Sequence, residues 1–181
     1  MSLVGPLVSV VVAAVAVIVY IVSVATNYWV VISTVSSKSY YGLWQFCQSV
    51  PGLSACTAFP SASLTAYMEA TRGLMLTAVI VAVISWILAL AGLIGKGTGQ
   101  SFIKKFTKTF WTINGLIFCA TGLLVMIGTT VFAVETNKDY GGRGIDYSFG
   151  YSIILGWVSI PLGVIAAALL TYFLRAMCDD E

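Results

Sequence analysis

Four apolar segments, each long enough to cross a lipid bilayer, constrain this chain more than any other feature of its sequence. They cover about 7–26, 74–95, 110–134 and 147–174. A helix needs about 20 mostly apolar residues to span the hydrocarbon core, and an open sheet edge cannot exist in lipid. The segments therefore predict a mainly α membrane protein, built as a left-handed four-helix transmembrane bundle.

Composition argues against most soluble and catalytic functions. Only 9% of the residues are charged, whereas soluble domains carry about 25%. Histidine is absent from the sequence, which removes the usual general base and the commonest metal ligand. We find neither a glycine-rich phosphate loop nor ligand-spaced cysteines, and a net charge of +2 does not indicate nucleic acid. We expect no enzymatic activity, metal, cofactor or nucleic-acid partner.

Basic residues set the expected orientation. The connection at 96–109 carries four lysines and no acidic residue: Lys96, Lys104, Lys105 and Lys108. Positive residues favour the cytosolic side, so this connection is the predicted cytosolic loop. Both termini are then cytosolic, and 27–73 and 135–146 form extracellular loops 1 and 2. The first span is longer than a signal-peptide core and has no basic residue before it, which favours a retained helix over a cleaved signal.

Extracellular loop 1 has the composition of a small folded domain. It is too long for a simple connector and too apolar for a disordered segment. β-Forming residues cluster at 30–35 and 40–46. We interpret Ser-Ser-Lys-Ser at 36–39 as a turn or crest, and Pro51-Gly52 as a second turn. The pattern predicts a small antiparallel extracellular β-sheet standing on the bundle.

The four cysteines differ in their expected roles. Cys47 and Cys56 flank the predicted turn at 51–52, where adjacent strands would bring them together, and extracellular cysteine pairs oxidise. We predict a disulfide between them, the alternative being two free thiols. Cys119 lies inside the third span and is interpreted as a small packing residue. Cys178 follows the fourth span at the predicted cytosolic face and is a candidate lipidation site, by palmitoylation.

An ordered set of residues in loop 1 resembles a known signature. The set is Trp29, Gly42, Leu43, Trp44, Cys47 and Cys56. It reproduces the W…GLW…C…C pattern of the claudin superfamily, which includes claudins, peripheral myelin and epithelial membrane proteins, the lens fibre membrane protein and γ-type channel subunits. Further similarity runs through 59–75 and 147–157. The resemblance implies a single claudin-like domain over 1–181.

The signature residues have a physical interpretation that is structural first. Trp29 and Trp44 are amphipathic rings suited to the membrane interface, where they would seat the sheet on the helices. Gly42 permits a close backbone approach. Arg72, at the outer end of the second span, would pair with loop groups while its stem packs on apolar surface. We interpret these residues as building the loop rather than binding a ligand.

The resemblance implies a function at cell–cell contacts. Claudin-like proteins oligomerise in cis and in trans, forming tight-junction-type barriers or paracellular channels in the plasma membrane. Lys38 is the only charge between Trp29 and Glu69. In a narrow pore it would favour anions, and the alternative is a solvated turn lysine. Tyr140 is the one aromatic at the tip of loop 2 and the candidate for contact there, because this loop lacks the usual aromatic-Asn-Pro turn.

Two other functions fit the same signature. One is an auxiliary subunit that binds an ion channel or receptor, as γ-type subunits do. The other is a membrane-organising protein of the epithelial or myelin type, without a sealed barrier. The partners expected across these hypotheses are further copies of this chain, related claudin-like proteins, a channel or receptor subunit, and membrane lipid, which the loop lysines would attract.

Overall fold

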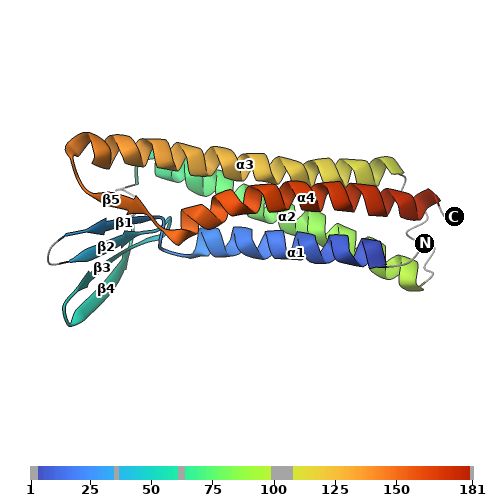
Figure 1. The fold of residues 1–181 in the computed structure, drawn as a ribbon, viewed down its shortest axis with the longest axis horizontal. Helices are drawn as coiled ribbons and strands as arrows, with labels where there is room; N and C mark the ends of the chain where they lie inside the picture. The colour runs from blue at the N-terminus through green and yellow to red at the C-terminus, as the bar shows by residue number, and fades with distance from the viewer. Residues whose placement is uncertain (1–3, 35–36, 61–63, 99–107, 180–181) are drawn as a thin grey trace.

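The computed structural model describes residues 4–34, 37–60, 64–98 and 108–179. These form long helices that lie side by side, with a small sheet at one end of the bundle (Figure 1). In chain order the elements are α1 (Val4–Ala25), β1 (Val30–Ser33), β2 (Lys38–Tyr41), β3 (Gln45–Val50), β4 (Leu53–Ala58), α2 (Ala66–Thr98), α3 (Lys108–Tyr140), the 3-10 turn η3 (Gly141–Arg143), β5 (Tyr147–Phe149) and α4 (Tyr151–Asp179). α1 begins and α4 ends at the end of the bundle opposite the sheet.

The four helices are long and apolar enough to cross a membrane, which confirms the predicted mainly α membrane fold. Large apolar side chains such as Leu7, Ile80, Leu116 and Ile165 are exposed on the outer faces of the bundle, where lipid would cover them. α2 and α3 extend beyond the predicted spans: each has 33 residues, or about 50 Å of helix against a hydrocarbon core of about 30 Å. Their surplus turns support the sheet.

Inside the bundle, α4 packs extensively on both α1 and α3, and α3 packs on α2. The seams are lined by small residues, which let helices approach closely in lipid. Ser85 and Asn114 join α2 to α3: the Ser85 hydroxyl donates to the Asn114 side-chain oxygen at 2.8 Å, and the Asn114 amide donates to the Ser85 carbonyl at 3.3 Å. Both residues are buried, so this exchange satisfies polar groups that lipid could not.

Within the described residues the sheet has five strands in the order β4-β3-β2-β1-β5, and all neighbours are antiparallel. In the β3–β4 hairpin, Val50 pairs with Leu53, and the two residues between them form the turn. Gly52 has φ +85° there, which suits the third position of a turn with proline before it. The predicted small antiparallel sheet and its Pro-Gly turn are therefore confirmed.

Strand β5 is a departure from the predicted domain boundaries, which placed 147–149 in the fourth transmembrane span. Tyr147–Phe149 instead pairs with β1, with Val30 opposite Phe149 and Ile32 opposite Tyr147. The helix begins afterwards, at Tyr151. The apolar Tyr-Ser-Phe segment is compatible with either structure on its own, and the free edge of β1, distant in sequence, decides between them.

Cross-strand pairs lie on the same side of a sheet, so the register defines two faces. Apolar and aromatic residues form the face turned toward the bundle, and several pack on its core: Val30, Ile32, Tyr41, Phe46, Tyr147 and Phe149. The other side, here called the polar face, carries Val31 but is otherwise mostly polar or small: Ser33, Lys38, Tyr40, Cys47, Ser49, Ser54, Cys56 and Ser148.

Candidate functional site

The two signature tryptophans attach the sheet to the C-terminal end of α1. The Trp29 indole N–H donates to the Ser23 carbonyl at 2.9 Å, and the Trp44 indole N–H donates to the Val24 carbonyl at 2.9 Å. The last carbonyls of a helix lack intrahelical donors, so both indoles satisfy groups that would otherwise be orphaned. Trp29 is completely buried, with its ring edge-on to Phe132 at 4.9 Å. It lies in the protein core rather than at the predicted lipid interface.

Gly42, Leu43 and Arg72 form the second attachment point. A Cβ at Gly42 would lie 2.6 Å from the Asn27 Cα, so a side chain there would force two backbone segments apart. Leu43 is fully buried. The Arg72 Nε donates to the Leu43 carbonyl at 2.6 Å, and its guanidinium lies 5.1 Å from the centre of the Trp44 ring. The segment Gly42–Trp44 is thereby joined to α2 by a charge-assisted hydrogen bond and a cation–π contact.

A third attachment joins the start of α4 to the end of α1, and sequence reasoning missed it. The Gly150 N–H donates to the Trp29 carbonyl at 3.0 Å and the Ser152 N–H to the Tyr28 carbonyl at 3.1 Å. The Ser23 hydroxyl donates to the Ser152 carbonyl at 2.8 Å. Similarity of 147–157 to the claudin pattern was the only signal for this region, and it did not single out Ser152.

The disulfide lies on the outermost strands. Cys47 in β3 and Cys56 in β4 are directly opposite each other, with a Cα–Cα distance of 4.0 Å, and their sulfurs are bonded. Every residue of β4 is exposed, so this strand gains little from apolar burial. A covalent link is the physical means of holding such a strand, because it limits the freedom of the unfolded chain.

Lys38 lies on the polar face and is exposed. It is the first residue of β2, opposite Ser33 on one side and Ser49 on the other, and so does not belong to the predicted turn at 36–39. The described part of the turn is closed by a hydrogen bond from the Thr34 N–H to the Ser37 carbonyl at 2.9 Å. Strand pairing on both sides gives Lys38 a fixed backbone position.

The model of the PMP-22/EMP/MP20/Claudin family matches residues 2–170. The chain belongs to that family. It is 28% identical to Mus musculus claudin-18 over 165 residues, 78% of this chain and 61% of the relative. It is 29% identical to the Rattus norvegicus lens fiber membrane intrinsic protein over 146 residues, 79% and 76% of the two chains. It is 26% identical to Rattus norvegicus claudin-15 over 171 residues, 88% and 74%.

Tyr140 of this claudin-family chain packs inward. Its ring centre lies 6.0 Å from that of Tyr41 in β2 and 6.0 Å from that of Tyr147 in β5. Beside it, Asp139 accepts a hydrogen bond from the Tyr67 hydroxyl at 3.1 Å. This packing connects the outer end of α3 to the bundle-facing side of the sheet, which leaves Tyr140 only half-exposed for contact with another molecule.

The two cysteines outside the disulfide lie on helices of the claudin-type bundle, Cys119 on α3 and Cys178 on α4. Cys178 belongs to the last turns of α4, but its side chain is outside the described part of the structure, as are Lys104 and Lys105. Cys119 is a free, half-buried thiol. Among the described residues no three His, Cys, Asp or Glu side chains gather in a way that could hold a metal ion.

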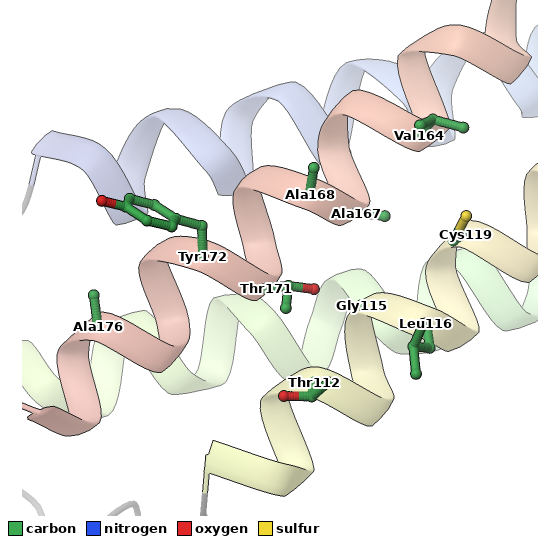
Figure 2. A pocket seen from close by; sticks show the side chains of 10 residues that line it. All are labelled: Thr112, Gly115, Leu116, Cys119, Val164, Ala167, Ala168, Thr171, Tyr172 and Ala176. Carbon is green, nitrogen blue, oxygen red and sulfur yellow. The ribbon is translucent and has the colours of Figure 1, made fainter.

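A groove of about 590 Å³ runs between α3 and α4 and includes Cys119 (Figure 2). Figure 2 shows Gly115 and Thr171 facing one another across its floor, and a Cβ at Gly115 would overlap the Thr171 hydroxyl. Leu116 and Tyr172 on its walls are strongly exposed, so the groove opens toward lipid. The groove forms because the small residues where α3 and α4 approach each other closely leave space beside them.

Proposed function

We propose that this chain is a claudin-like protein of cell–cell contacts in the plasma membrane, which forms a tight-junction-type barrier or paracellular channel through cis and trans oligomers. Family membership supports the general assignment. The observation that carries the proposal is a sheet whose strands and flanking loops form hydrogen bonds to all four described helices, with a polar face on the side opposite the one that packs on the bundle core. A surface of this kind keeps its shape while it contacts other copies.

The proposal places the sheet outside the cell and both termini in the cytosol. Three features support this orientation. The disulfide between Cys47 and Cys56 needs an oxidising compartment. The lysine-rich segment 96–109 favours the cytosol. The start of α1 and the end of α4 lie at the same end of the bundle, away from the sheet (Figure 1).

Lys38 is the proposed selectivity residue. Within the five described strands it is the one charged side chain, and the strands on either side of it offer serines. A fixed positive charge on the wall of a narrow aqueous passage attracts anions and repels cations within about 8 Å at physiological salt. The polar face would therefore line the passage and favour anions.

Expression in fibroblasts that lack junctions, followed by freeze-fracture electron microscopy, tests assembly. Continuous strands at cell contacts are the expected result. Their absence, with the protein present at the cell surface, would refute the barrier or channel proposal.

Dilution potentials across an epithelial monolayer test the role of Lys38. Lys38→Gln should lower the preference for chloride over sodium, and Lys38→Glu should lower it further. The matched control is Lys138→Gln on α3, where the lysine is also exposed but pairs with Glu135 at 2.6 Å. Unchanged dilution potentials for both Lys38 variants would refute the selectivity role and show that Lys38 is a solvated strand lysine.

A membrane-organising role without a sealed barrier is the second candidate. It is favoured by the inward packing of Tyr140 and by an identity to the lens fiber membrane intrinsic protein as high as that to claudin-18. Close membrane apposition without strands in the fibroblast experiment would support it. Co-purification of a channel or receptor from native membranes would instead support the auxiliary-subunit role.

A further inference from the structure

A second groove lies where the polar face of the sheet meets the bundle. It encloses about 490 Å³ and is here called the sheet-base groove. Its walls include Thr26 directly after α1, Tyr151 at the start of α4, and Tyr40 and Ser49 in the sheet. Small-molecule sites commonly have volumes of about 300–1,000 Å³, so the groove has room for a compact ligand.

Three tyrosines form one side of the groove. The Tyr28 ring centre lies 4.7 Å from that of Tyr40 and 4.9 Å from that of Tyr151, the latter pair being stacked at 26°. These separations leave no space between the rings for a quaternary ammonium group, so the cluster is a platform and not a cation cage. Within the described residues, none of the three phenol hydroxyls has a hydrogen-bond partner.

The rest of the lining is polar but uncharged. None of the described residues that line the groove is a Lys, Arg, Asp or Glu, so neither a phosphate nor a metal ion finds a counter-charge there. Ser49 and Ser54 share a hydrogen bond of 3.0 Å on the wall formed by the sheet. The lining matches a neutral ligand with many hydroxyls and one apolar face, which is the chemistry of a sugar ring.

The position of the groove selects the source of that sugar. Its lining includes Ala25, the last residue of α1, and Tyr151, the first residue of α4, so it lies at the level where these two helices would leave the membrane. We propose that the sheet-base groove binds the neutral sugar headgroup of a glycolipid, with the sugar ring on the tyrosine platform. Placement in the outer leaflet rests on the orientation proposed above.

Native mass spectrometry of the purified full chain tests the proposal. The protein in detergent is incubated with galactosylceramide or with ceramide, which has the same chains but no sugar. Preferential retention of galactosylceramide is the expected result, and equal retention of the two lipids would overturn the proposal. Because purified protein is used, the outcome does not depend on whether the chain forms junctional strands in cells.

Two variants test the platform. Tyr151→Leu removes the stacked ring and should lower galactosylceramide occupancy about 2- to 10-fold. Tyr40→Phe removes only a hydroxyl that has no partner among the described residues, so this variant should fold normally. Its galactosylceramide occupancy should also fall about 2- to 10-fold. The matched control is Tyr172→Leu near the other end of α4, where the tyrosine is also exposed.

The control also defines the contrary outcomes. A loss in Tyr172→Leu as large as that in Tyr151→Leu would show that the groove is not the site. Binding of free methyl galactoside with the same variant pattern, without retention of galactosylceramide, would overturn the assignment to a membrane lipid.

Discussion

A single hydroxyl in the centre of the bundle offers the sharpest test of the helix packing. Tyr20 on α1 is completely buried, and its hydroxyl has no hydrogen-bond partner among the described residues. It points to Gly163 on α4: a Cβ there would overlap the hydroxyl oxygen, whereas the next ring atom, Cζ, would lie 3.5 Å away. The space beside Gly163 is therefore filled by one oxygen atom.

The magnitudes follow from this geometry. Gly163→Ala should destabilise the bundle by about 1–3 kcal/mol through overpacking, less about 0.5–1 kcal/mol gained from replacing a helical glycine. Tyr20→Phe should stabilise it by about 1 kcal/mol, because an unsatisfied buried hydroxyl is removed. In the double variant the methyl group occupies the space left by the oxygen at ordinary contact distance. We therefore expect the double variant to be at least as stable as the wild type, with a coupling energy of about 1–3 kcal/mol.

Thermal unfolding of the four proteins in one detergent measures the cycle, at about 2–4 °C per kcal/mol for a chain of this size. Gly73→Ala on α2 is the control for helix propensity, because a Cβ at Gly73 would meet nothing within 4 Å. Additive effects of Tyr20→Phe and Gly163→Ala, or a Gly163→Ala variant as stable as the control, would refute the reasoning.

Three further perturbations probe how the sheet is attached. Cys56→Ser opens a link between residues nine positions apart and should cost about 2–3 kcal/mol, seen as faster proteolysis of the sheet in limited digestion. Gly150→Ala should prevent folding, since its Cβ would overlap the Tyr28 carbonyl oxygen, while Gly142→Ala, with open space around it, should behave as wild type in size-exclusion profiles. Trp29→Phe leaves a helix-terminal carbonyl without its donor and should lower the unfolding free energy by about 1–3 kcal/mol in the same detergent.

Local signals in the sequence were sufficient for the helices and for part of the sheet. Long apolar runs admit one structure in lipid, and the Pro51-Gly52 turn places Cys47 opposite Cys56. Helix ends were less predictable: α2 and α3 continue beyond the apolar segments because their outer turns pack on the sheet, as Tyr140 does on Tyr41.

Features that depend on contacts between different elements of the fold were not predictable in the same way. The composition of Ser-Ser-Lys-Ser predicts a turn that includes Lys38, yet pairing with Ser49 extends the strand to include this residue. The amphipathic ring of Trp29 favours the lipid interface, whereas its indole N–H donates to a carbonyl of α1 inside the protein. In both cases a partner elsewhere in the fold outweighed local preference.

The pairing of β5 with β1 has a consequence for synthesis in the cell. The edge strand that completes the sheet is separated from its partner by two transmembrane helices and more than a hundred residues of sequence. During translation one edge of β1 therefore stays unpaired until the chain has been synthesised past Phe149. Any product that terminates earlier keeps that edge exposed, so quality-control machinery could distinguish finished from unfinished molecules by this one strand.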